Sequence, residues 1–447
     1  MAPDGPVRPL EADTSTDVAI VGAGIAGVAT AFFTLRSTSK RVLLIERDRV
    51  ARGATGRNAG QLTTYFERPL FDIAAEFGIE AAVDGQRAFD DAHDLMDLMG
   101  AEAGTDVRVE RFVGHMGMFS LNHLQIHLSN GLVRREGGLR PEPCVVSEEA
   151  AFLGDIPAEF ASLYEVVPQA RIRELLETDD DRYRAVLSDV KGCANAGLFV
   201  QQVLAWLERT YPDRLRYVDE TIVGRVVVRG SGGVVVHARG HEISADHVVL
   251  CTNGFTDHVV EDEAGEPIRL HERQQIVGTI GYMAAFFEQR MRLPAAMSYI
   301  RNVEIGGDVP YVYVTRRTYD RAATGHGTSS MVPSTLTCMG GPEWPIDGEW
   351  VRDAPFPGAL LDTMDAIIRP FAQPSRPAGQ PYDFQWHGLM GYMSGRVRVI
   401  GAHPGRPALL YNLGCNGVGF LPSIHGGRQI ARMLSGERLP PSIFDPR

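Results

Sequence analysis

The stretch DVAIVGAGIAGVATAFFTLRSTSKRVLLIE, Asp17 to Glu46, decides the fold. It begins with an apolar, β-branched run, passes through closely spaced glycines, and continues with apolar residues at helical spacing. A second apolar run, RVLLI, then ends in an acid. The order predicts a buried strand, a tight turn, a helix and a second strand, which together begin a βαβ unit with a parallel sheet.

The glycines of this stretch, Gly22, Gly24 and Gly27, have GxGxxG spacing. The first permits the tight turn, the second lets the backbone approach a pyrophosphate, and the third lets the helix pack on the strand. Ile25 and Ala26 begin the helix, whose free amides point at the negative charge. The turn therefore predicts a dinucleotide site, although a glycine turn used only for packing is the alternative.

Glu46 stands 22 residues after Gly24, at the end of the second predicted strand. A carboxylate there accepts hydrogen bonds from the adenosine ribose hydroxyls and repels a 2′-phosphate, which argues against NADP. We include the neighbouring Arg47 in this site. NAD and FAD both satisfy these contacts, so a second signal is needed to choose between them.

Two further glycine-rich segments supply that signal. In GATGRNAGQL, glycines let the backbone pass close to a flat ring, and polar side chains face its edge or the substrate; the predicted contacts are Gly53, Ala54, Thr55, Arg57, Asn58, Ala59, Gly60 and Gln61. Near the C-terminus, a second turn precedes a helix whose amides would stabilise negative charge on a reduced ring. Its predicted contacts are Gly414, Asn416, Gly417, Val418 and Gly419. The alternative is that both segments are ordinary turns.

Together with HVVLCTNGFTDH (His247 to His258) and YNLGCNGVGFLPSIHGGRQIARMLSGE (Tyr411 to Glu437), GATGRNAGQL resembles the D-amino-acid oxidase superfamily of FAD enzymes. That superfamily includes glycine oxidase, sarcosine oxidase and the γ-glutamylputrescine oxidoreductases, and GRNxGQ looks most like the last group. The resemblance covers both ends of the chain and is thin over 76–165 and 262–380. It implies FAD as cofactor, with further contacts from Val223, Thr252, Asn253 and Gly254.

The fold implied is α/β, with a Rossmann-like FAD-binding domain of glutathione-reductase-like topology assembled from separate segments. We expect this domain to comprise residues 17–75, 166–261 and 385–440. An inserted α+β substrate-binding domain with a mostly antiparallel sheet would comprise 76–165 and 262–384. Residues 1–16, rich in proline and acids and without an apolar run, read as a loose tail and not as a signal peptide.

The segment HGLMGYMSGRVRVIG departs from the amino-acid oxidases that it resembles. Met390 stands where those enzymes place an arginine that binds the substrate α-carboxylate, and a thioether cannot hold a carboxylate. Arg396 stands where the putrescine-type relatives also carry an arginine. No cysteine lies between Trp386 and Met393, so FAD is expected to bind non-covalently.

The resemblance and the residues together suggest catalytic groups. His387, next to Trp386, is a candidate proton acceptor, with an ordinary hydrogen-bonded histidine as the alternative. Arg57, Tyr311 and Tyr313 are candidates to face the substrate; packing on a half-buried strand is the alternative for the tyrosines. His123 and His127 have i,i+4 spacing, but no third ligand is evident, so no metal is predicted.

Lysine is scarce in this chain. Relatives use a lysine of the substrate domain to help oxygen react with the reduced flavin, and we expect neither Lys40 nor Lys191 to lie in that domain. The electron acceptor, oxygen or another compound, therefore stays open, and so does the oligomeric state.

Composition narrows the partners. The 44 Lys+Arg against 56 Asp+Glu give a net charge of -12, which disfavours nucleic acid. Five scattered cysteines without a CxxC pair suggest reduced thiols in the cytosol. No membrane span is expected, because glycines interrupt the one uncharged stretch.

The sequence thus predicts a cytoplasmic FAD-dependent oxidoreductase that removes hydride from a carbon bearing an amine and yields an imine that water hydrolyses. The alternatives are oxidation of a 2-hydroxy acid by the same fold, or a flavin-binding subunit without turnover.

Overall fold

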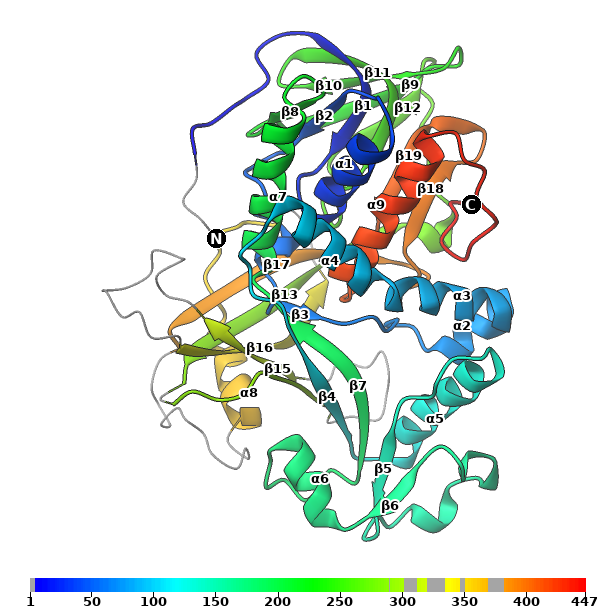
Figure 1. Cartoon of the computed structure of the whole chain (residues 1–447), viewed down its shortest axis with the longest axis vertical. Helices are drawn as coiled ribbons and strands as arrows, with labels where there is room; N and C mark the ends of the chain where they lie inside the picture. Colours follow the sequence, from blue (N-terminus) through cyan, green and yellow to red (C-terminus); the bar gives the residue numbers. More distant parts are fainter. Residues whose placement is uncertain (1–4, 289, 301–311, 320–333, 346–349, 369–381) are drawn as a thin grey trace.

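The protein is built on two mixed β-sheets, and the computed structural model describes residues 5–288, 290–300, 312–319, 334–345, 350–368 and 382–447. In Figure 1 the sheet that contains β1 lies in the upper part of the molecule and the strands of the second sheet cross below it. Both termini of the chain contribute to the upper part, as the sequence predicts from its two glycine-rich ends.

The first sheet has the order β12-β9-β10-β11-β1-β2-β8, with β19 paired to β11 and β18 to β19. Its centre is parallel, because β1 runs parallel to β11 and β2, and β8 runs parallel to β2. Strands β9 and β10 form an antiparallel hairpin at one side of the sheet. The strands of this sheet are β1 (Thr14–Val21), β2 (Val42–Ile45), β8 (Leu215–Val218), β9 (Val223–Val228), β10 (Val234–Ala238), β11 (His241–Leu250), β12 (Val259–Asp262), β18 (Val399–His403) and β19 (Arg406–Leu413).

Three helices complete this part: α1 (Ile25–Ser37), α7 (Ala196–Thr210) and α9 (Phe420–Leu434). Their apolar faces are buried with one face of the sheet in a single hydrophobic cluster. Helices α1 and α9 lie side by side although almost 400 positions separate them, as the blue and red ribbons in Figure 1 show. The two ends of the chain therefore form one structural unit.

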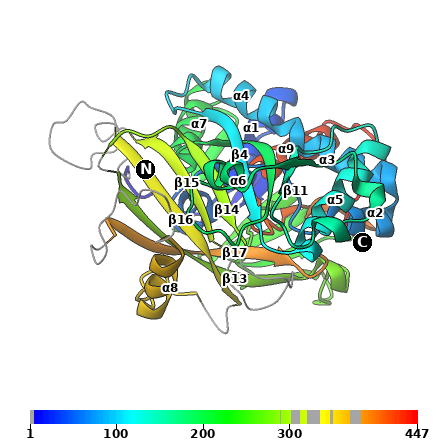
Figure 2. The same ribbon diagram turned by 90° about the horizontal axis from the view of Figure 1, so that it is seen from below.

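The second sheet has the order β17-β13-β16-β15-β14-β4-β7-β5-β6, with β3 paired to β7. Most neighbours are antiparallel; β4 with β14 and β5 with β6 are parallel. Figure 2, seen from below, shows its long central strands crossing the molecule. The strands are β3 (Gln61–Leu62), β4 (Glu110–Met118), β5 (Cys144–Ser147), β6 (Glu165–Val167), β7 (Ala185–Cys193), β13 (Ile276–Phe287), β14 (Ala295–Tyr299), β15 (Val312–Tyr319), β16 (Ser334–Pro345) and β17 (Phe384–Met393).

The remaining helices accompany these sheets. Residues 70–103 form three successive helices, and Gly78, at φ 89°, separates the first two. These helices are α2 (Leu70–Phe77), α3 (Ile79–Asp90), α4 (Ala92–Ala103), α5 (Leu121–Glu136), α6 (Gln169–Leu176) and α8 (Gly358–Ile368), with 3₁₀ turns η1 (Ala54–Gly56), η2 (Leu153–Asp155), η3 (Ala158–Phe160) and η4 (Glu272–Gln274).

The expected α/β fold is confirmed, and its two sheets are both mixed. Two details differ from the expected segments. Strand β7 pairs with β4 along its whole length, and β17 pairs with β13, so both belong to the second sheet. Residues 185–193 and 384–393 were expected mainly in the FAD-binding domain. The sequence could not assign these strands to a sheet, because the apolar composition of a strand does not identify the strands with which it pairs.

The loose tail expected for residues 1–16 is also wrong from Arg8 onward. The side chain of Leu10 is 1% exposed and belongs to the cluster beneath the first sheet. Its backbone N–H donates to Thr221 Oγ1 at 3.1 Å, and the N–H of Arg8 donates to Asp219 at 2.7 Å. Strand β1 then begins at Thr14. One leucine among prolines and acids is too weak a pattern to predict this docking.

Within the described ranges, no helix has the length and apolar character needed to cross a bilayer.

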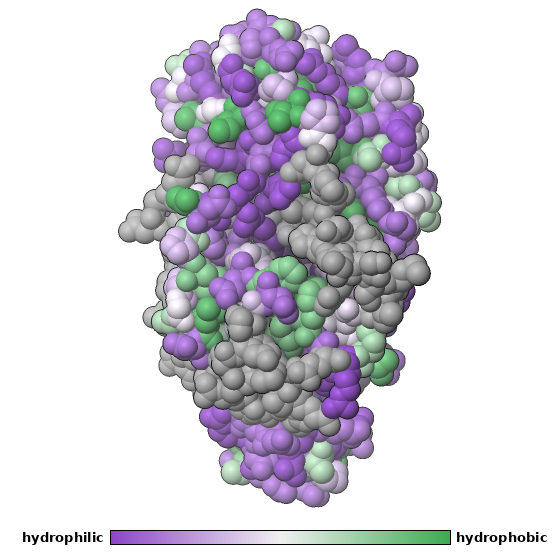
Figure 3. All heavy atoms as spheres, turned by 90° about the vertical axis from the view of Figure 1, so that its left-hand side faces the viewer, coloured by the Kyte–Doolittle hydropathy of each residue, from purple (hydrophilic) through white to green (hydrophobic). Residues whose placement is uncertain are grey.

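Figure 3 shows one face of the molecule, whose lower end is mostly hydrophilic and whose hydrophobic atoms gather at mid-height beside the grey residues.

Replacing Leu10 with alanine tests the docking of the N-terminal segment. Because a buried leucine is lost, we expect the free energy of unfolding to fall by about 2–4 kcal/mol in chemical denaturation. Val7→Ala, at an exposed position of the same segment, is the matched control and should change it little. Equal unfolding midpoints for the two variants would contradict the contact.

Candidate cofactor and substrate site

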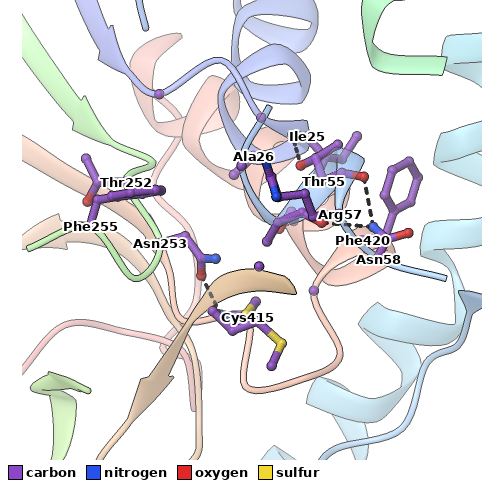
Figure 4. A pocket seen from close by; sticks show the side chains of 18 of the residues that line it. Ile25, Ala26, Thr55, Arg57, Asn58, Thr252, Asn253, Phe255, Cys415 and Phe420 are labelled. Carbon is purple, nitrogen blue, oxygen red and sulfur yellow. Dashed lines mark hydrogen bonds between the residues drawn. The ribbon is translucent and has the colours of Figure 1, made fainter. Parts of the chain in front are cut away.

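One cavity joins the two sheets and contains most of the residues that the sequence singled out. The cavity has a volume of about 220 Å³. Figure 4 shows side chains from four separate segments around this space, among them Ala26, Arg57, Asn253 and Cys415. The cavity therefore depends on the tertiary structure and not on any one motif.

The glycine turn forms one wall. Gly22, Gly24, Ile25 and Ala26 line the cavity. Gly24 is the N-cap of α1, no side chain caps this helix, and no acid lies in its first turn. The helix therefore presents its positive end to the cavity, which suits an anionic group.

Two contacts hold this turn in place. The N–H of Ile25 donates to Thr55 Oγ1 at 3.0 Å, which links α1 to the second glycine-rich segment. A Cβ atom on Gly24 would lie 3.0 Å from the same hydroxyl oxygen. Any larger residue at 24 would therefore fill the space between these two segments.

Glu46 and Arg47 also line the cavity. The Glu46 carboxylate accepts from the N–H groups of Ala23 at 2.7 Å and Asp48 at 3.0 Å. Burial raises the pKa of Glu46 to about 7. The Arg47 guanidinium pairs with Asp257 at 3.0 Å. These contacts fix the two side chains at the end of β2, on the cavity wall where the sequence predicts ribose binding.

The second glycine-rich segment lines the cavity with Gly53, Ala54, Thr55, Arg57, Asn58, Ala59 and Gln61. Arg57, predicted as catalytic, donates through Nε to the carbonyl of Arg52 and through Nη1 to that of His387, at 3.1 and 2.9 Å. Trp386 Nε1 donates to the carbonyl of Arg57 at 2.9 Å. Arg57 therefore joins this segment to β17, and its predicted catalytic role stays a prediction.

Val223, Thr252 and Asn253 line the cavity from the first sheet, as do Gly414, Gly417, Val418 and Gly419 from the turn before α9. Asn253 Oδ1 accepts from the N–H of Gly391 at 3.2 Å and of Cys415 at 3.4 Å. One side chain thus connects the loop after β11, strand β17 and the C-terminal turn.

Four predicted contact residues do not line the cavity but support residues that do. A Cβ on Gly27 would lie 1.8 Å from the carbonyl oxygen of Gly22, so this glycine serves helix packing. A Cβ on Gly60 would lie 2.2 Å from the carbonyl oxygen of Ala194, and one on Gly254 would lie 2.5 Å from that of Met390. Asn416 accepts from the N–H of Met393 at 2.7 Å. Their contact with the cofactor stays a prediction.

The predicted substrate residues have different surroundings. Tyr313 and Met390 line the cavity, whereas Tyr311 lies outside the described residues. The His387 ring is 5% exposed, and its Nδ1 accepts from Trp350 Nε1 at 2.9 Å while Nε2 lies 3.1 Å from the carbonyl of Ala354. These partners favour a structural role for His387, and its role as proton acceptor stays an untested prediction.

The sequence did not identify several cavity residues, notably Tyr65, Glu67, Glu343 and Arg398. Arg398 is 3% exposed and donates to Asn412 Oδ1 and Ser423 Oγ, each at 3.0 Å. Its Nε and Nη1 have no hydrogen-bond partner in the described part of the chain. A buried guanidinium with spare donors beside the start of α9 adds positive charge to this wall. No motif marks these four residues, which come from separate segments.

A match to a family model covers residues 17–433, and that model describes the DAO family of FAD-dependent oxidoreductases. The chain belongs to this family. It is thus an FAD-dependent oxidoreductase, and the cofactor predicted from the sequence is confirmed.

Individual relatives of this DAO-family protein are distant. A γ-glutamylputrescine oxidoreductase of Escherichia coli (strain K12) is 32% identical over 77 residues, which are 17% of this chain and 18% of that protein. Glycine oxidase from Geobacillus kaustophilus is similar in structure, with a TM-score of 0.66, 15% identity and 96% of each chain covered. L-proline dehydrogenase from P. horikoshii has a TM-score of 0.65 and 14% identity, over 95% of this chain and 94% of that one. The structural likenesses show the shared fold.

The cavity residues fit FAD. The uncapped start of α1 and the Gly24 cradle suit the pyrophosphate, Glu46 suits the ribose, and the turn around Gly417 suits a flat ring. Cys415 lines the cavity, and its thiol lies 3.6 Å from the carbonyl oxygen of Gly391. Non-covalent attachment stays a prediction.

Lys191 lies in the second sheet, on β7, which corrects its expected place outside the substrate domain. Its Nζ lies 5.6 Å from the centre of the Tyr65 ring, and that ring lines the cavity. Burial lowers the pKa of Lys191. The sequence placed this lysine wrongly because β7 precedes the strand-rich region along the chain.

His123 and His127 on α5 lie in contact, with 3.2 Å between their Nε2 atoms. Burial lowers the pKa of His123 to about 4 and that of His127 to about 3, so both rings are neutral near pH 7. Among the residues that the structure describes, no three His, Cys, Asp or Glu side chains are grouped as metal ligands.

The variant Gly24→Val tests the glycine cradle. Its side chain would collide with Thr55 and block the approach of the pyrophosphate, so we expect FAD content to fall at least about tenfold. The measurement is the ratio of flavin to protein absorbance after purification. Gly224→Val, on β9 with open space around its Cα, is the control and should keep its FAD. Full FAD content in Gly24→Val would refute the assignment.

Proposed function

We propose that this DAO-family enzyme oxidises the C–N bond of an amine or N-substituted amino compound. The substrate loses a hydride from the carbon and a proton, and the resulting imine is hydrolysed to a carbonyl compound and an amine. When bound, FAD accepts the hydride.

The observation that carries this proposal is the lining around Met390. It lies on β17 with its thioether methyl 2.8 Å from the position that a Cβ on Gly281 would occupy, and both residues line the cavity. A substrate α-carboxylate buried here would need a charged or multiply donating partner, which a methionine does not supply.

Two of the arginines that line the cavity are engaged by other groups: Arg47 pairs with Asp257, and Arg57 donates to two backbone carbonyls. Arg398 keeps two spare donors beside the start of α9, on the wall with the glycine turn before that helix. This arrangement supports a substrate without a free α-carboxylate near Met390. The likeness of a short stretch to a γ-glutamylputrescine oxidoreductase supports the same substrate class.

The residues of the chain would contribute position and environment. Met283, Met390 and the Tyr313 ring give the cavity an apolar side, and Tyr313 Oη lies 3.3 Å from Met283 Sδ. Such a wall excludes water, and a partly dry site disfavours an ammonium relative to the neutral amine that releases hydride. No separate base is required by this argument.

The proposal is tested by mixing the purified enzyme anaerobically with candidate substrates and following the flavin absorbance. We expect bleaching with an N-acylated polyamine, which has no α-carboxylate, and none with a 2-hydroxy acid. Bleaching with the hydroxy acid alone, or with no compound of this panel, would overturn the proposal.

Met390→Arg tests the substrate wall separately. An arginine here would supply the missing carboxylate partner, so we expect bleaching by simple α-amino acids to become at least about tenfold faster. Met390→Leu keeps the volume without the charge and should show no such gain. An arginine variant with an unchanged substrate profile would show that residue 390 does not contact the substrate.

A further inference from the structure

The side of the cavity formed by the second sheet contains two carboxylates among tyrosines. Tyr65 and Glu67 follow β3, Tyr313 lies on β15 and Glu343 on β16, and all four line the cavity. Tyr392 on β17 joins them by donating its hydroxyl to Glu343 Oε2 at 2.8 Å. We refer to these five residues as the acidic tyrosine cluster.

The two carboxylates of the cluster converge beside the turn that suits the flavin ring. A Cβ on Gly417 would lie 2.7 Å from the Tyr392 hydroxyl and 2.9 Å from Glu67 Oε1. Because Tyr392 is hydrogen-bonded to Glu343, both acids approach the same side of Gly417. The cluster therefore lies next to the place where the chemistry would occur.

The Glu67 carboxylate has no hydrogen bond or ion pair in the described part of the chain, although it lines the cavity. Burial and the nearby Glu343 charge raise the pKa of Glu67 to about 8. Arg396 and Lys191 act in the opposite direction. The Arg396 guanidinium lies over the Tyr392 ring, and the Lys191 ammonium over the Tyr65 ring. Neither forms an ion pair with Glu67, which is thus left to a ligand from the cavity.

The chemistry of the cluster favours an organic cation over a metal ion. Ca²⁺ is held by six to eight oxygen ligands, drawn largely from carboxylates and carbonyls, whereas two carboxylates and phenol rings are present here. An alkylammonium uses both kinds of group, since it donates hydrogen bonds to carboxylates and is attracted to aromatic faces.

We propose that Glu67 and Glu343, with the rings of Tyr65 and Tyr313, bind a positively charged alkylammonium group of the substrate other than the amine that loses hydride. This inference rests on the proposed function and specifies its substrate class as amines that carry a second, cationic nitrogen. The cluster and Met390 would then both select against substrates with a free α-carboxylate, because the cluster repels this group and Met390 cannot bind it.

The inference is tested by calorimetric binding to the FAD-loaded enzyme without oxygen. The probe is butyltrimethylammonium, which has no amine lone pair and so cannot be oxidised through it. Butanoate and butan-1-ol provide anionic and neutral comparisons of similar length. We expect the wild-type enzyme to bind the cation at least about tenfold more tightly than either comparison compound.

The variants Glu67→Gln and Glu343→Gln each remove an ionisable carboxyl group with little change in volume. Binding is measured at about pH 9, where Glu67, with its pKa raised to about 8, is ionised. We expect each to weaken binding of the cation at least about tenfold while its FAD content stays at the wild-type value. Glu142→Gln is the matched control, because burial raises the pKa of Glu142 to about 7 and this residue is not part of the cavity wall. It should bind the probe as the wild type does.

Preference for the anion, absence of cation binding by the wild-type enzyme, or undiminished binding in both glutamine variants would overturn the inference. The wild-type comparison of the three probes decides the matter if a variant fails to fold. If amines bleach the flavin but the cationic probe does not bind, the proposed function is supported and the cation site is refuted. If the probe binds tightly but no amine bleaches the flavin, the cation site is supported and the proposed function is refuted.

Discussion

The close packing of α9 against α1 is the contact on which the rest of the site depends. A Cβ on Gly427 of α9 would lie 2.7 Å from backbone atoms of Ala29 and Thr30 in α1, so the two helices touch along their main chains. This contact brings the C-terminal turn around Gly417 next to the first glycine turn at Gly24. A single cavity can then hold a dinucleotide between segments from opposite ends of the chain.

The second constraint is the attachment of β17 to both sides of the cavity. Arg57 donates to the carbonyl of His387 and its own carbonyl accepts from Trp386, which joins this strand to the segment after β2. Asn253 joins the strand to the C-terminal turn. Gly254 and Gly391 allow these close approaches, since a Cβ on either would lie under 3 Å from backbone atoms. The strand that carries Met390 is therefore held firmly against the place where the flavin ring fits.

The two ends of the cavity carry opposite charge. The start of α1, Arg47 and Arg398 give the dinucleotide part a positive character, which suits phosphates. The second sheet instead brings Glu67 and Glu343 together, which suits a cation. A chain with net charge -12 can thus present a positive wall to an anionic cofactor and an acidic cluster in one cavity, because local groups outweigh the overall charge.

The sequence by itself determined the dinucleotide half of this protein. Its signals are local: a strand, a glycine turn and a helix follow one another within thirty residues, and each must be where it is for steric reasons. The DAO-family cofactor followed from two more short motifs. The tertiary structure alone decided the proposed substrate half, because Glu67, Tyr313 and Glu343 come from three segments with no motif and meet only at the cavity, the last two through the pairing of β15 with β16. It also decided that Lys191 belongs to the second sheet and that Leu10 is buried, since both depend on contacts between residues far apart in the chain.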